Sequence, residues 1–171
     1  MATTYTLINS NVLSSSAASI TFSSIPATYT DLVVRTSTRD DRADTQNAIQ
    51  MTFNGNSSTV YSLTNMRGNG SSASTDRSSS QTFARIEYEN STNSTSNTFT
   101  SAEFYIPSYL ASQNKPSSTF ITSERNATEA FIYAYANLFS STTAISSFTL
   151  APVSANFVSG SSFYLYGISN A

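Results

Sequence analysis

The sequence contains no cysteine, no histidine and no tryptophan, and few of its residues are charged. The lack of cysteine excludes disulfides, thiol nucleophiles and thiolate metal sites. The lack of histidine removes the commonest general base, and no Gly-x-Ser-x-Gly motif is present to position a serine nucleophile. Only 11% of residues are charged and the net charge is −2, so no basic surface for nucleic acid is expected. The sequence predicts a protein that is not an enzyme and holds no cofactor or metal.

Long hydrophobic runs are also absent. The longest apolar stretch, residues 131–139, contains two tyrosines and an asparagine, and it is much shorter than the roughly 20 residues that cross a bilayer. The first cationic residue is Arg35, so the basic start of a secretory signal is missing. We therefore expect no membrane partner and synthesis without a signal peptide.

About one-third of the residues are serine or threonine, yet 39% are hydrophobic and these occur in short alternating bursts. Such bursts at intervals of about 8–12 residues are typical of the strands of a sandwich or barrel. Eleven segments have this pattern: Thr4–Asn9, Ala18–Ser23, Asp31–Thr38, Ala48–Asn54, Val60–Met66, Thr82–Glu89, Thr98–Ile106, Ser117–Ser123, Glu129–Leu138, Ala144–Ala151 and Ser162–Ile168.

No segment has a convincing helical period, and at most a short turn is expected at Ser108–Gln113. The sequence therefore predicts one all-β domain over residues 1–171, an antiparallel jelly-roll-like sandwich of about eight to ten strands. The apolar faces of the strands predict these core residues: Ile20, Phe22, Leu32, Val34, Ile49, Met51, Phe53, Ile86, Phe104, Ile106, Phe148, Leu150, Phe163 and Leu165.

Two polar segments are predicted as surface loops, Gly68–Ser80 and Asn90–Asn97, because they contain almost no apolar residues. Between them lies the best pair of carboxylates, Glu87 and Glu89. Residues two apart on a strand share a face about 6.6 Å apart, which lies in the range used by glycosidases. The alternation with Arg85 favours a solvated strand face instead.

One short segment concentrates charge, with Arg39, Asp40, Asp41, Arg42 and Asp44 between two predicted strands. The three aspartates could supply oxygen ligands to Ca²⁺, but their spacing lacks the usual pattern of a calcium loop. A loop laced by internal ion pairs is favoured. A contact with another subunit or with a capsid is the next interpretation, since arginine forms bidentate pairs across interfaces.

Tyrosines mark two strands. Tyr133 and Tyr135 alternate with small residues on one strand, and Tyr164 and Tyr166 lie on the last. Such a face either packs in the core or an interface with its hydroxyls at the margin, or stacks on sugar rings.

The edges of the predicted sheets have little protection, because the sequence contains a single lysine and few other charges. Unprotected edges favour a symmetric oligomer, and we expect a homotrimer or incorporation into a larger assembly.

The segments Thr4–Ile8, Ser19–Pro26 and Tyr29–Val33 resemble those of small structural proteins of tailed-phage virions. The later segments Phe104–Pro107, Asn114–Pro116, Ala144–Leu150 and Phe163–Ile168 fit the same pattern, so the resemblance covers most of the chain. Its motifs describe strands and turns and carry no binding site.

The resemblance implies a virion surface protein, either a head-decoration (cement) protein or a tail-fibre-associated protein. The expected partners are other copies of the chain and the outer face of the major capsid protein. The alternative is a tail module that binds host surface glycans.

Overall fold

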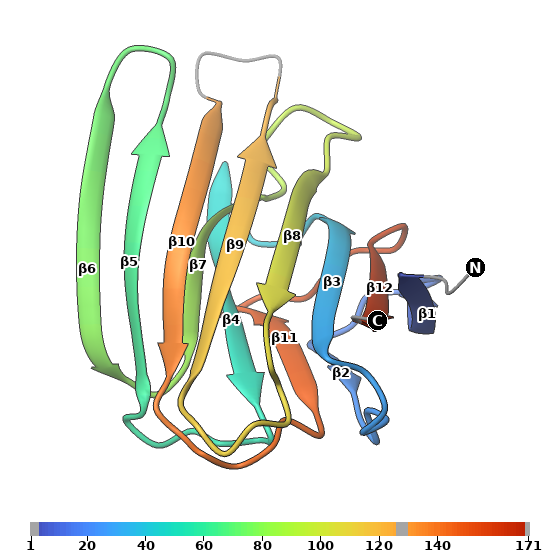
Figure 1. Ribbon diagram of the computed structural model, residues 1–171. Helices are drawn as coiled ribbons and strands as arrows, with labels where there is room; N and C mark the ends of the chain where they lie inside the picture. The colour runs from blue at the N-terminus through green and yellow to red at the C-terminus, as the bar shows by residue number, and fades with distance from the viewer. Residues whose placement is uncertain (1–3, 126–129, 170–171) are drawn as a thin grey trace.

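The computed structural model describes residues 4–125 and 130–169. They form twelve strands in two antiparallel sheets that pack face to face as a single-domain sandwich (Figure 1). The predicted all-β antiparallel sandwich is therefore confirmed. The described residues form twelve strands rather than the predicted eight to ten, divided unequally between an eight-stranded and a four-stranded sheet.

The spatial order of the strands in each sheet differs from their order in the chain. The larger sheet consists, from one edge to the other, of β1 (Tyr5–Val12), β12 (Ser162–Ile168), β3 (Asp31–Thr38), β8 (Thr100–Ile106), β9 (Lys115–Ser123), β10 (Phe131–Phe139), β5 (Tyr61–Gly68) and β6 (Ala73–Gln81). The smaller sheet consists of β2 (Ile20–Phe22), β11 (Phe148–Pro152), β4 (Gln46–Phe53) and β7 (Ala84–Asn90).

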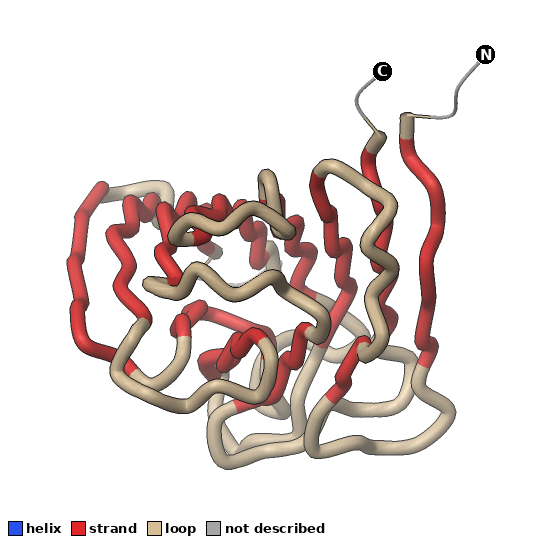
Figure 2. Tube along the Cα trace, turned by 60° about the horizontal axis from the view of Figure 1, so that its bottom comes forward, coloured by secondary structure: helices blue, strands red, loops and turns tan. Residues whose placement is uncertain are grey.

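The larger sheet is wider than the smaller one, so its two ends extend past the sandwich (Figures 1 and 2). At one end the β5–β6 hairpin passes beyond β7, and at the other end β1 lies outside β12. No residue of β1 or β6 is buried. Neither of these edge strands contributes a buried residue to the core, although Ile8 of β1 is partly buried and packs against it.

The core follows the predicted pattern. Every one of the fourteen predicted core residues is buried, with at most 7% of its surface exposed. The ring of Phe148 packs against two others in the core, with centroids 5.6 Å apart for Phe53–Phe148 and 5.8 Å for Phe104–Phe148. Side-chain alternation alone therefore identified the buried face of these strands.

All eleven predicted strands are present, although their bounds shift by a few residues; Glu129, where the prediction began β10, lies outside the described residues. The prediction of a surface loop at Gly68–Ser80 was wrong, because Ala73–Gln81 forms the edge strand β6. The strand was missed because neither of its faces is buried and apolar. Its backbone pairs with β5, and tertiary context supplied what the sequence pattern lacked.

The predicted turn at Ser108–Gln113 is confirmed. The only lysine of the sequence, Lys115, follows the turn and bonds back to it. Lys115 is buried, and its Nζ donates hydrogen bonds of 2.5 Å to the carbonyls of Ala111 and Gln113. Burial lowers the pKa of this amine. The single lysine therefore closes a turn and does not protect a sheet edge.

Candidate functional site: a polar groove along β7

A polar groove runs along the open edge of β7, where the β5–β6 hairpin extends past the smaller sheet. A central hollow of about 390 Å³ is flanked by hollows of about 220 and 150 Å³, and Tyr88 lines all three. We call this feature the β7 groove. Its central hollow is lined by Leu63, Asn65, Arg67, Asp76, Arg77, Ser78, Gln81, Arg85, Glu87, Tyr88, Tyr133 and Tyr135.

The edge of β7 that faces the β7 groove is irregular. Tyr88 has a φ of 71°, and the pairing of β7 with β4 shifts register at this point. Such an irregularity is a β-bulge, which twists the strand and interrupts regular pairing. On the preceding residue, the backbone N–H of Glu87 donates a 2.8 Å hydrogen bond to the hydroxyl of Tyr135. The middle of this edge is therefore already occupied by a side chain.

A stack of tyrosines forms the floor of the groove. The rings of Tyr133 and Tyr135 lie 5.4 Å apart and nearly parallel, and Tyr88 stacks on Tyr133 at 5.0 Å. Arg67 covers their hydroxyls, since its Nη1 donates to Tyr88 at 3.1 Å and to Tyr133 at 3.3 Å. Its Nε donates to Ser74 of β6, which ties the hairpin to the floor. Burial raises the pKa of Tyr133 and Tyr135, so both hydroxyls stay protonated.

Two of the four arginines that line the groove form ion pairs. Arg85 Nε lies 2.6 Å from Glu87 Oε1, and Arg42 Nη2 lies 3.8 Å from Asp44 Oδ2 at one end. Arg67 is a further charged group, whose pKa is raised chiefly by its contact with Tyr133 and also by nearby Asp76. The groove therefore offers both donors and acceptors, and its four arginines and three carboxylates leave only a small net positive charge.

The four candidate tyrosines do not form one face. Tyr133 and Tyr135 are buried side chains that line the groove, which fits the interpretation as core residues. Tyr164 and Tyr166 are half-buried on the outer surface of the larger sheet. There the Arg35 guanidinium lies 5.9 Å from the centroid of the Tyr166 ring.

The five residues of the charged segment lie in two different environments, buried and exposed. Arg39 is 9% exposed, and its guanidinium donates to the backbone carbonyls of Thr92, Ser94, Thr95 and Thr98. Asp40 is fully buried. These two residues hold the 91–99 loop in place and present no surface to a subunit or a capsid, which corrects that part of the prediction.

The other three charged residues, Asp41, Arg42 and Asp44, retain exposed surface. Asp41 receives hydrogen bonds from the backbone and side chain of Asn156, at 2.8 and 3.0 Å. Their contact with a partner stays a prediction.

The predicted solvated face carrying both Glu87 and Glu89 is also wrong. Glu87 is half-buried beside Arg85, whereas Glu89 is 1% exposed and neither of its carboxylate oxygens has a hydrogen-bond partner. The bulge at Tyr88 turns Glu89 inward, where it faces Asp40 and Thr38. Burial, and then the charge of Asp40, raise the pKa of Glu89 well above its usual range. The two glutamates therefore do not form a catalytic pair.

The main groove residues that the sequence did not identify are Asn65, Arg67, Asp76 and Gln81. The sequence did not predict the face of the β5–β6 hairpin that carries them, because β6 has no alternation of apolar and polar residues. Arg67 follows directly on a predicted strand, which is the one signal that could have found it.

Among residues 4–125 and 130–169, no helix is long and apolar enough to span a membrane. The same residues contain no cluster of three or more His, Cys, Asp or Glu side chains arranged to hold a metal ion. No protein family, curated protein sequence or solved structure matches this chain.

Proposed function

We propose that this chain is a non-enzymatic structural protein of a phage virion surface, a cement or decoration protein that binds the outside of the major capsid protein. The proposal combines the resemblance of its strand segments to small virion proteins with one structural observation. That observation is the open outer edge of β1, which pairs with β12 on its other side.

Strand β1 is suited to pairing with another chain. It is eight residues long and contains no charged residue. Its large apolar side chains are open to solvent, with Leu7 51% and Val12 60% exposed. Soluble proteins usually protect such an edge with charge, proline or a covering loop, because its free N–H and C=O groups template strand addition. A subunit or a capsid protein that pairs with β1 would cover both the backbone and these side chains.

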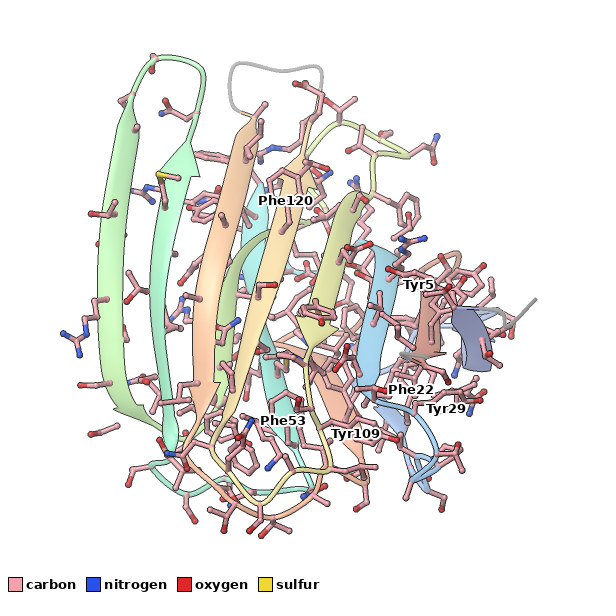
Figure 3. All side chains as sticks on the ribbon, in the orientation of Figure 1. Tyr5, Phe22, Tyr29, Phe53, Tyr109 and Phe120 are labelled. Atoms are coloured by element: carbon pink, nitrogen blue, oxygen red, sulfur yellow. The ribbon has the colours of Figure 1, made fainter. Side chains whose placement is uncertain are left out.

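The outer face of the larger sheet provides a second surface. Met66, Phe120 and Ile132 are each more than half exposed, and Ala134 lies between Met66 and Phe120 in the strand register. Figure 3 shows Phe120 projecting from this outer face. Burial of such apolar side chains against a shell contributes about 25 cal/mol per Å². A cement protein would use this gain to join neighbouring capsomers and resist expansion of the shell.

The proposal is tested by comparing two variants, each with a lysine on one edge of the larger sheet. Leu7→Lys on β1 is expected to convert a homotrimer to a monomer and abolish co-sedimentation with capsid shells, while the far-ultraviolet spectrum stays that of a β-protein. Thr75→Lys on β6, an edge that already carries charge, is the matched control and should leave assembly intact. Sedimentation velocity and pelleting with shells are the measurements.

A wild-type chain that sediments as a stable monomer and binds neither itself nor shells would overturn the proposal. Immunogold labelling of intact particles gives the location directly. Many copies over the shell are expected, and a few copies confined to the tail would favour the second candidate.

That second candidate is a tail-associated module that binds host surface glycans. The β7 groove favours it, because the groove is long, polar and lined by side chains that can hydrogen-bond to hydroxyl groups. In either role the protein performs no chemistry, consistent with the separate environments of Glu87 and Glu89.

A further inference from the structure

We infer that the β7 groove is a binding site for an extended, hydroxyl-rich ligand, a neutral oligosaccharide chain. The inference rests on the second of the two proposed functions and adds to it the site, the residues and the ligand chemistry. It rests on the glycan binding in that proposal and not on the location in the tail.

The shape of the groove fits a linear polymer. The three hollows share lining residues, with Arg67 and Tyr88 common to the central hollow and one flank, and Arg85, Glu87 and Tyr88 common to it and the other. They therefore adjoin one another along β7, whose seven residues extend over about 20 Å. A single small molecule would fill one hollow, whereas a chain of sugars would follow the groove.

The charge pattern indicates a neutral ligand. Arg85 and Arg42 each have a carboxylate partner within the groove, and Asp76 lies near Arg67. With Arg77, the lining holds four arginines against the three carboxylates of Asp44, Asp76 and Glu87, so its net charge is small. An anionic ligand would need to compete with these carboxylates. A sugar hydroxyl both donates and accepts, so it can bridge a guanidinium and a carboxylate that lie side by side.

One buried polar group supports a ligand independently. Asn65 lies in the central hollow with only 6% of its surface exposed, and its side-chain carbonyl oxygen has no hydrogen-bond partner. A buried polar atom without a partner costs free energy, and binding sites commonly retain such atoms for a ligand or an ordered water. A hydroxyl donor bound in the hollow would satisfy it.

A peptide strand is the competing occupant of an open sheet edge, and the geometry of β7 disfavours it. Strand addition needs a regular row of free backbone groups. The N–H of Glu87 is already donated to Tyr135, and the left-handed φ of Tyr88 breaks the row at the next residue. A ligand in the groove is therefore bound by side chains and not by backbone pairing.

The test uses two glutamates in matched settings. Glu87 pairs with Arg85 at 2.6 Å inside the groove, and Glu103 pairs with Arg35 at 2.7 Å on the outer face of the other sheet. The wild-type chain, Glu87→Ala and Glu103→Ala are applied to an array of immobilised bacterial surface oligosaccharides. The best binder is then titrated calorimetrically. Glu87→Ala is expected to weaken its affinity about tenfold or more, and Glu103→Ala to leave it unchanged. Thermal melts of all three proteins establish that each is folded.

Each other outcome overturns the inference. Absence of binding to every oligosaccharide at millimolar concentration would remove both the site and the glycan-binding function. Binding that is lost in Tyr166→Ala but kept in Glu87→Ala would preserve the function and place the ligand on the outer face. Displacement of the bound oligosaccharide by an unrelated extended peptide would show that the groove accepts a strand.

Discussion

The buried carboxyl of Glu89 gives the sharpest test of the structure. Glu89 is 1% exposed and faces Asp40, which is itself fully buried and accepts hydrogen bonds from Asn47 Nδ2 at 2.6 Å and from the backbone N–H of Arg42 at 3.1 Å. Arg39 lies near Asp40, but its guanidinium is committed to loop carbonyls. Two adjacent buried carboxylates cannot both ionise cheaply, so the folded protein holds a proton on the pair.

This proton makes stability depend on pH with a definite sign. The pKa of Glu89 is raised in the folded state by burial and by Asp40, whereas in the unfolded chain it is about 4.3. The stabilising contribution of the protonated form is complete below the unfolded pKa and is lost as pH rises through the folded pKa. Over that window each pH unit costs about 1.4 kcal/mol of unfolding free energy.

Glu89→Gln keeps the shape of the side chain and removes the ionisation. The amide stays neutral at every pH, so the advantage of the variant over wild type in unfolding free energy should grow by about 1.4 kcal/mol per pH unit above about pH 4.3, until the pH reaches the folded pKa of Glu89. Urea denaturation curves between pH 4 and pH 8 measure it. Glu103→Gln on the outer face, which loses only the exposed pair with Arg35, should change stability by less than about 1 kcal/mol throughout. Parallel profiles of wild type and Glu89→Gln over this range would refute the shared proton.

Three further changes test other parts of the fold. Phe53→Ala should lower the unfolding free energy by about 3–5 kcal/mol, because the ring is 1% exposed and packs among other aromatic rings; a loss below about 1 kcal/mol in urea would show that this strand face is misassigned. Arg39→Ala should lower the unfolding free energy by about 2–4 kcal/mol, since four loop carbonyls lose their donor. The control Arg42→Ala, at an exposed residue, should lower it by less than about 1 kcal/mol. Equal melting temperatures for the two variants would contradict the role of Arg39 in holding the 91–99 loop. Gly167→Ala places a Cβ against the ring of Tyr29, closer than van der Waals contact allows, so a loss of about 1–3 kcal/mol is expected; an unchanged thermal midpoint would mean that the ring moves away without cost.

The site was much less predictable than the core. A groove needs residues from strands that are distant in sequence, and in this fold β5, β6 and β7 contribute facing side chains. Asp76 and Gln81 lie on a strand without an apolar face, so no pattern distinguished it from a loop. Tyr133 and Tyr135 were identified as notable, but the choice between a core and a binding face depends on what lies opposite them.

The sequence by itself determined the class of fold and the buried face of most strands. Residues such as Ile49, Met51 and Phe53 alternate with polar neighbours, and a strand places alternate side chains on opposite faces whatever its partners are. The absence of histidine and cysteine, which excludes thiol chemistry and the commonest general base, can also be read from the sequence without the structure. These conclusions needed only the geometry of a single strand.

The tertiary structure decided everything that depends on partners. The bulge at Tyr88 turned Glu89 from the solvent into the core, and the 91–99 loop converted Arg39 from a candidate contact into an internal brace. The unequal widths of the two sheets left β1 and β6 as open edges and created the β7 groove. Register, bulges and overhang arise from pairing between distant segments, and the energies that select them are absent from any one segment alone.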